Sequence, residues 1–334
     1  MDTLKIALCF LTLLLAQSCS PNAPATSAPA SSKEMRPGIE VSSAWIEKVR
    51  RYNYHSDSRT LLAELESFIK PDTLDGTSDK PHLDNGVLHP EAPGGRMKPL
   101  FVNLDEEPGD ELVGLFGYSR RDISLMVFKQ IAGRWYLLYS ESFDLFNEEQ
   151  ELQLVNNFSA NKVFYVRNLY GRGTCNYSDG YQFFKLIRNR VYSCLELVNS
   201  ASSCGMYSTP NEEVNMHFAF DSWHADEVRV SYTYDYFATI QDKDYNSRDV
   251  SLTKGTGGFT CVWDSVKNRY RPVFDSVATR WSTPGLSAEK LTYFSSFDEK
   301  DFVNGFQDEI KQTLKTGTAE QKKLLREYLA TIKK

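Results

Sequence analysis

The sequence predicts a mainly β protein built of repeated antiparallel hairpins, propeller-like or a β-sandwich, with α-helices flanking it at both ends. Three observations support this prediction. Aromatic residues make up 13% of the 334 residues (20 Phe, 18 Tyr and 5 Trp), and aromatic side chains favour strands. Short aromatic and β-branched runs alternate with Gly, Asn and Asp turns from residue 100 to about residue 281. Apolar residues at helical spacing precede and follow this region.

The composition is that of a globular protein, with 41% hydrophobic and 25% charged residues. It excludes a disordered chain, a collagen-like fibre and a polytopic membrane protein. The formal charge is −6, from 38 Lys+Arg and 44 Asp+Glu. A nucleic-acid-binding protein needs a basic face to displace counterions, so this balance argues against nucleic acid as a partner.

The first 18 residues have the features of a signal peptide. Lys5 precedes an apolar run at 6–16 that is interrupted only by Thr12. Eleven helical residues span roughly 16 Å, about half of a bilayer core, so this run is too short to cross a membrane. The small residues Ala16 and Ser18 suit cleavage by a signal peptidase.

The next residue is Cys19, and the segment from Leu15 to Cys19 resembles the lipobox of bacterial lipoproteins. The resemblance implies that Cys19 follows the cleaved bond and carries acyl chains such as palmitate. Residues 19–40, rich in Ser, Ala and Pro, would then be a flexible tether. We therefore expect a protein anchored in the bacterial cell envelope, on the periplasmic or outer-membrane face. Plain secretion is the alternative.

Three further segments follow the tether. Residues 41–98 contain two predicted helices, at 42–52 and 58–70, and then a loop at 71–98 that is rich in Pro, Gly and Asp. Residues 99–285 form the predicted β region. Residues 286–334 return to helix: one helix is predicted to stop at Gly317, and a capping box from Thr318 to Gln321 opens the last one.

The β region contains a repeated hairpin. Each copy has an aromatic residue, then an Ile or Val three positions later, two turn residues, an Arg and a strand. The aromatic residues are Phe128, Phe184 and Trp263, and the second turn residues are Gly133, Asn189 and Asn268. Gly and Asn tolerate the positive φ that a tight hairpin requires. A divergent fourth hairpin is predicted at 218–232, turning at 224–226.

Residues 102–114, before the first copy, resemble the loop of FG-GAP or VCBS-type β-propeller repeats, in which an Asp-rich loop precedes an apolar strand. The resemblance implies a calcium site with oxygen ligands from Asn103, Asp105, Glu107 and Glu111. The chain departs from the family at Pro108, where the family has Gly. The alternative interpretation is a solvated acidic turn, and we expect no stabilisation by calcium.

The chain has six cysteines, and the four that would remain after processing form an even set that suits an oxidising compartment. Cys9 leaves with the signal peptide, and lipidation of Cys19 leaves an even number, namely Cys175, Cys194, Cys204 and Cys261. A turn at 188–189 makes paired positions in the second hairpin sum to 377, which places Cys194 opposite Phe183 and Cys175 opposite Ser202. This register predicts disulfides between Cys175 and Cys204 and between Cys194 and Cys261.

Tyr232, Tyr234 and Tyr236 alternate along one strand with Thr233 and Asp235. If exposed, this ladder could bind sugar rings or a peptide. The alternative is a sheet face packed against a neighbouring layer.

Catalytic motifs are missing from the sequence: it has no zinc-type His pair, no CxxC, no GxSxG and no phosphate loop. The Gly-rich run at 254–258 is predicted to be a connection between strands. We therefore expect a non-catalytic binding or scaffolding module without a cofactor, whose partners are the membrane and a protein or glycan ligand. The alternatives are a secreted hydrolase acting on envelope carbohydrate or peptide, and an inhibitor or accessory factor of another envelope enzyme.

Overall fold

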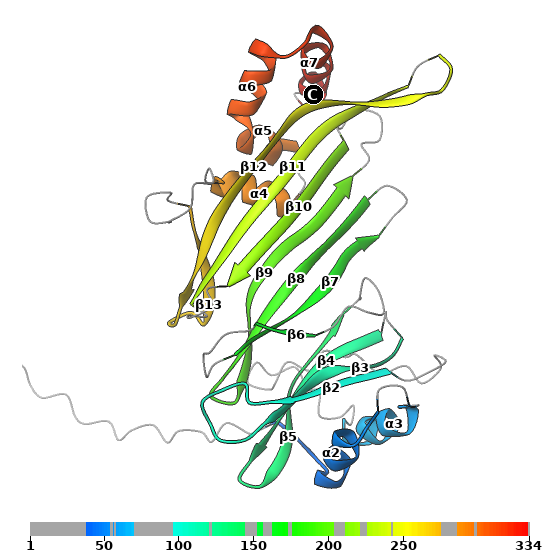
Figure 1. Ribbon diagram of the computed structural model, residues 1–334, viewed down its shortest axis with the longest axis vertical. Helices are drawn as coiled ribbons and strands as arrows, with labels where there is room; N and C mark the ends of the chain where they lie inside the picture. The colour runs from blue at the N-terminus through cyan, green and yellow to red at the C-terminus, as the bar shows by residue number, and fades with distance from the viewer. Residues whose placement is uncertain are drawn as a thin grey trace, which may run out of the picture. The chain divides into compact units, whose positions relative to one another are not determined.

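The computed structural model describes residues 38–53, 56, 58–69, 96–119, 122–143, 152–155, 162–172, 176–203, 211–220, 226–241, 243–274, 286–296 and 299–332. All of them belong to one unit of the chain, residues 37–334. The described strands form two antiparallel sheets, with the orders β1-β5-β4-β3-β2 and β13-β12-β11-β10-β9-β8-β7-β6 (Figure 1). The prediction of a mainly β fold flanked by helices is confirmed, and the described strands form no closed propeller.

After β1 (Ile39–Val41), the described strands follow one another as three antiparallel meanders of four strands each. Meander 1 consists of β2 (Arg96–Val102), β3 (Glu111–Ser119), β4 (Asp122–Ile131) and β5 (Arg134–Phe143). Meander 2 consists of β6 (Gln153–Leu154), β7 (Val163–Arg172), β8 (Asn176–Ile187) and β9 (Arg190–Ser203). Meander 3 consists of β10 (Asn211–Phe220), β11 (Glu227–Gln241), β12 (Ser247–Asp264) and β13 (Arg269–Val273). Pairing of β10 with the end of β9 joins meanders 2 and 3 into the eight-stranded sheet.

The first two copies of the predicted hairpin are the third and fourth strands of meanders 1 and 2. Their two-residue turns have positive φ at both positions, 49° and 81° at Ala132 and Gly133 and 49° and 63° at Arg188 and Asn189. Two consecutive residues with positive φ match the right-handed twist of the flanking strands. The predicted turn geometry is therefore confirmed in these two copies.

Both β-bulges of meander 1 have counterparts among the three β-bulges of meander 2. The β4–β5 register skips Leu138 and the β8–β9 register skips Cys194. These residues are 56 positions apart, the same spacing as the repeat. Likewise the β3–β4 register skips Tyr118 and the β7–β8 register skips Tyr170. Because these turns and bulges are shared, the similarity between meanders 1 and 2 extends beyond the hairpin that the sequence revealed to the strand before it.

Meander 3 departs from the predicted hairpin in two respects. The pair Asp264–Arg269 closes a four-residue turn, so Val266 is 90% exposed in the turn instead of lying in a strand. The Gly-rich run at 254–258, predicted to connect strands, lies inside β12. Gly255 is opposite Tyr234, and a Cβ at Gly255 would stand 2.5 Å from the Tyr234 hydroxyl. Glycine is needed there because the tyrosine ring lies across the strand.

Each meander has two faces, and we call face 1 the face that carries the aromatic residue of the repeat. Face 1 of meander 1 packs under α2 (Ser43–Arg50) and α3 (Arg59–Phe68), which confirm the two predicted N-terminal helices. The ring centroids of Trp45, on α2, and Phe128 are 5.4 Å apart. The short strand β1 (Ile39–Val41) pairs with β5 beside them.

The meanders stack in a constant orientation, each placing face 2 on face 1 of the next. Between meanders 1 and 2, Tyr139 and Phe143 contact the face-1 residue Phe184. Between meanders 2 and 3, Phe183 contacts Phe218 and Phe220 at 5.2 and 5.6 Å between ring centroids. This succession is that of neighbouring repeats in a solenoid or of neighbouring propeller blades, without closure.

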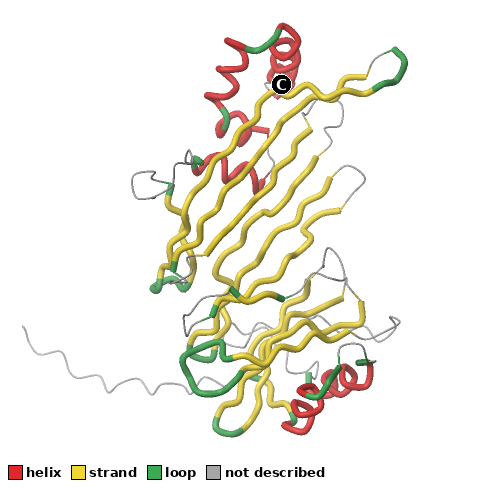
Figure 2. Tube along the Cα trace, in the orientation of Figure 1, coloured by secondary structure: helices red, strands yellow, loops and turns green. Residues whose placement is uncertain are grey.

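The remaining part of face 1 of meander 3 packs on the C-terminal helices, which lie behind and beyond the strands (Figures 1 and 2). They are α4 (Ala288–Ser296), α5 (Glu299–Gly305), α6 (Gln307–Thr316) and α7 (Ala319–Ile332). The predicted stop at Gly317 is confirmed. So is the capping box: the Gln321 amide donates to Thr318 Oγ1 and the Thr318 amide to Gln321 Oε1, at 3.1 and 2.8 Å. No described helix has both the length and the apolar character needed to cross a bilayer.

Candidate functional site

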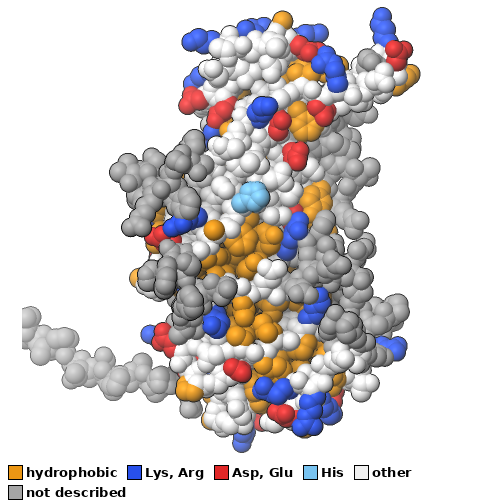
Figure 3. Space-filling view, viewed as in Figure 1, with side chains coloured by type: hydrophobic (Ala, Val, Ile, Leu, Met, Phe, Trp, Pro, Cys, Tyr) orange, Lys and Arg blue, Asp and Glu red, His pale blue; other side chains and the backbone are white. Residues whose placement is uncertain are grey.

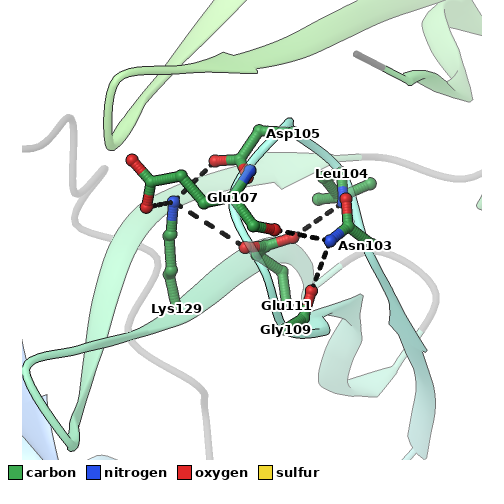
Figure 4. Close-up of polar contacts among 7 residues, drawn as sticks. All are labelled: Asn103, Leu104, Asp105, Glu107, Gly109, Glu111 and Lys129. Carbon is green, nitrogen blue, oxygen red and sulfur yellow. Dashed lines mark hydrogen bonds and ion pairs between the residues drawn. The ribbon is translucent and has the colours of Figure 1, made fainter. Parts of the chain in front are cut away.

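The four predicted calcium ligands lie close together, three in the loop between β2 and β3 and the fourth, Glu111, at the start of β3 (Figure 4). The ammonium group of Lys129, from β4, lies among the carboxylates. Its Nζ is 2.6 Å from Asp105 Oδ2, 2.7 Å from Glu107 Oε2 and 3.9 Å from Glu111 Oε1. The fourth predicted ligand, Asn103, instead donates hydrogen bonds to the carbonyls at positions 107 and 109.

The position that the resemblance would give to a metal ion is thus occupied by a lysine. Lys129 is only 3% exposed, and Asp105 and Glu111 are 6% and 2% exposed. Burial alone would lower the pKa of Lys129, but its hydrogen bonds to Asp105 and Glu107 raise it above its ordinary value. Burial raises the pKa of Glu111, although the Leu104 amide donates to its carboxylate. Among the described residues no group of three or more His, Cys, Asp and Glu side chains is arranged to hold a metal.

Sequence reasoning brought the acidic residues together but missed Lys129. The signal was present, because Lys129 and Lys185 occupy the same position of the repeated hairpin, 56 residues apart. Lys185 is also buried, but its Nζ lies over aromatic rings, 4.0 Å from the Trp263 centroid and 5.5 Å from that of Tyr270. One repeat position therefore holds two buried lysines in different surroundings.

The three predicted binding tyrosines are core residues. Tyr232, Tyr234 and Tyr236 are 1%, 6% and 0% exposed under the C-terminal helices. The ring centroid of Tyr232 lies 4.9 Å from that of Phe294, and the ring centroid of Tyr236 lies 4.9 Å from that of Phe302. The C-terminal helices therefore cover the three tyrosines. This is the alternative interpretation, a sheet face packed against a neighbouring layer.

Two of the predicted disulfide cysteines, Cys175 and Cys204, lie outside the described residues, as does the predicted lipidation site, Cys19. Cys194 and Cys261 are both free and buried, so the bridge predicted between them is not formed in this structure. Their strands, β9 and β12, have β10 and β11 between them in the sheet. Burial raises the pKa of each thiol to about 12, which keeps both in the unreactive protonated form.

The register that placed Cys194 opposite Phe183 was wrong because it contained no bulge. Leu195 is opposite Phe183, and the Cys194 thiol donates to the Phe183 carbonyl at 3.3 Å. A second bulge follows, so that Ser202 faces Tyr177 where the unbroken register had placed Cys175. Each bulge inserts one extra residue into one strand, so a register counted from the turn alone is displaced beyond it.

A shallow, open groove of about 430 Å³ lies across β10, β11 and β12. It is lined by Glu213, Asn215, Thr233, Tyr234, Asp235, Lys254, Gly255 and Thr256. The polar members lie in two cross-strand rows on face 2 of meander 3, Glu213–Asp235–Lys254 and Asn215–Thr233–Thr256. Figure 3 shows acidic and basic side chains together over the upper part of β11 and β12.

Several polar groups of this groove have no partner within the described part of the chain. The side chains of Thr233, Thr256 and Lys254 make no hydrogen bond or ion pair with any described residue. The two carboxylates have one partner each: Asn215 Nδ2 donates to Glu213 at 3.1 Å and the Ser251 hydroxyl to Asp235 at 2.7 Å. The groove therefore presents both hydrogen-bond donors and acceptors. Of the residues that line the groove, only Thr233 and Asp235 could be placed on one strand face from the sequence.

No family model matches the chain, and no curated protein or solved structure matches it.

Proposed function

We propose that the protein is a non-catalytic binding module that is held in the bacterial cell envelope by a lipid on Cys19. The module binds its ligand in the groove on β10–β12. One observation carries the proposal. Face 2 is largely apolar and covered in meanders 1 and 2, where Val127 and Phe183 are fully buried, whereas in meander 3 its side chains are polar and line a shallow groove. A terminal repeat needs a polar outer face for solubility, but solubility does not require a groove.

The groove favours a polyhydroxylated ligand, such as a glycan, that is neutral or carries an amine. At the groove β10 and β11 are hydrogen-bonded on both sides, so a peptide cannot add between them as a further strand. Hydroxyl groups such as those of Thr233 and Thr256 both donate to and accept from sugar hydroxyls. The two carboxylates outnumber the single ammonium of Lys254, which disfavours phosphate and other anions.

Binding of defined tetrasaccharides tests this proposal. Cellotetraose is the neutral probe and the glucosamine tetramer is the amine-bearing probe, each titrated into the protein by calorimetry. We expect the double variant Thr233→Val/Thr256→Val to bind about tenfold more weakly, as loss of hydrogen bonds worth about 1.4 kcal/mol implies. Thr316→Val, an exposed threonine of α6, is the matched control. Failure of the wild type to bind both probes would reject the ligand class.

A secreted hydrolase is the second candidate, and one observation favours it. Glu213 and Asp235 are directly opposite each other on β10 and β11, and a retaining glycosidase needs two carboxyl groups about 5–5.5 Å apart. Release of reducing ends from the same tetrasaccharides, abolished in Glu213→Gln and Asp235→Asn, would establish this activity and exclude simple binding.

A further inference from the structure

Lys185 lies at the junction between meanders 2 and 3 and carries its charge into an apolar layer. It is on face 2 of β8 and is 4% exposed. Its ammonium group lies between rings of meander 3: Trp263 of β12 and Tyr270 of β13. Around it the junction is built of apolar and aromatic side chains, including Phe183 and Phe220.

This charge lacks a bonded counter-charge among the described residues. No described carboxylate lies within 4.0 Å of Lys185, although the charge of Asp226 acts on it. Cys194 and Tyr270, the titratable groups nearest to it on β9 and β13, are neutral because burial raises the pKa of each. Burial likewise lowers the pKa of Lys185 itself, whereas the pKa of Lys129 is raised. The rings attract the ammonium, but they do not replace its hydration as three carboxylates do for Lys129.

We propose that the junction between meanders 2 and 3 opens before the rest of the molecule unfolds, because opening returns the Lys185 ammonium to water. The hinge is the short ladder between β9 and β10, in which Ser200–Ser203 pair with residues 212–215. Outside this ladder, the described contacts between the two meanders are made by side chains of the shared core, including the Tyr232 hydroxyl, which donates a hydrogen bond to the Val198 carbonyl. The meander that carries the groove can therefore swing away while meanders 1 and 2 stay folded.

Hydrogen–deuterium exchange on the intact protein, resolved by mass spectrometry, tests this proposal. Peptides from β13 (Arg269–Val273) and from residues 190–197 of β9 report on the junction, and peptides from β3 and β4 report on meander 1. We expect Lys185→Met to slow exchange at the junction by about tenfold and to leave β3 and β4 unchanged. Lys185→Arg keeps the charge and should exchange like the wild type.

Two results would overturn the proposal. One is unchanged or faster exchange at the junction in a folded Lys185→Met protein. The other is found in the wild type alone and does not depend on any variant. If the junction opens separately, its exchange rate should depend less steeply on low urea concentrations than the exchange of β3 and β4. An equal dependence in both regions would mean that the junction opens only by global unfolding.

Discussion

Lys129 and Lys185 show how a residue's neighbours decide its effect on the fold. Both occupy the same place in a repeated hairpin and both are almost fully buried. Lys129 meets Asp105 and Glu107 at ion-pair distance, and Lys185 meets Trp263. Removing one partner of a buried ion pair leaves an uncompensated charge, whereas removing a buried charge without a bonded partner relieves a cost. Substitution of the two lysines should therefore change stability in opposite directions.

For Lys129→Met we expect a loss of about 3–5 kcal/mol in the free energy of unfolding, measured in urea, because the buried carboxylates lose their counter-ion. The carboxylate cluster then has room for a cation. Calcium at about one hundred times its dissociation constant should restore about 2.7 kcal/mol to this variant. The wild type should gain nothing from calcium because its ammonium fills the position. A calcium-dependent rise in the melting temperature of the wild type would contradict this account.

The effect of Lys185→Met should depend on pH. Since the folded pKa of Lys185 lies below its ordinary value of 10.5, the folded protein favours the neutral amine. The cost of the charged form is fully present below the folded pKa and disappears as the pH rises to 10.5, at about 1.4 kcal/mol per unit of pKa difference. We expect Lys185→Met to be more stable than the wild type at pH 7 and the difference to shrink toward pH 10.5. A constant difference across this range would count against the explanation.

At the scale of single elements, the β8–β9 ladder bears on the predicted disulfide between Cys175 and Cys204. With both bulges included, the last described pair is Asn176 opposite Ser203, immediately next to the two cysteines in sequence. The unbroken register required a bridge across an offset of two residues, and the observed register removes this difficulty.

We therefore expect peptide mapping without reduction to find Cys175 joined to Cys204 in protein isolated from an oxidising compartment. The closed loop has about 30 residues, and its loss in Cys204→Ser should lower the free energy of unfolding by about 3–4 kcal/mol. Cys194→Ser is the matched control because that thiol is free. A Cys194–Cys204 bridge would refute the pairing.

Strand β12 is predicted to tolerate no side chain at Gly255. A methyl group there would meet the Tyr234 ring at 2.5–2.8 Å, and that ring is packed against Phe294 and Phe306. We expect Gly255→Ala to lower the free energy of unfolding by about 1–3 kcal/mol through overpacking. Thr256→Ala, on the opposite exposed face, should change it by less than about 0.5 kcal/mol. Thermal unfolding of both variants measures the contrast.

The elements that the sequence predicts correctly are those specified by local chemistry. Positive φ at Gly133 and Asn189 defines two hairpins, and the side chains of Thr318 and Gln321 define a helix start. The misplaced features are those that residue spacing does not specify. Val266 is apolar but exposed because the third turn has four residues, and the bulge at Cys194 shifts the pairing of β8 with the rest of β9 by one residue.

At the scale of the whole molecule, residue spacing predicts only part of the candidate site. Alternation placed Thr233 and Asp235 on one face, but whether that face is covered depends on the order in which the meanders stack. The acidic loop could be grouped from sequence because its members are neighbours, whereas Lys129 comes from a strand 24 residues after Asp105. Contacts between residues far apart in the sequence therefore decide both the exposure of this face and the position of Lys129.

Anchoring is a property of the whole protein and is tested on the intact cell. If Cys19 carries the lipid, the protein should partition into the detergent phase and incorporate a labelled fatty acid, and Cys19→Ser should abolish both. Two or three acyl chains hold a protein stably at a membrane, whereas one chain is marginal. A soluble, unlabelled wild type would refute the anchor.

The constant orientation of the stacked meanders has a consequence for how such a chain can grow. Because each meander places face 2 on face 1 of the next, another copy inserted between two meanders would meet a complementary face on either side. Only the ends are specialised: α2 and α3 close one and the polar face of β10–β12 closes the other. Duplication and loss of inner units are therefore the easiest routes by which relatives of different length would arise.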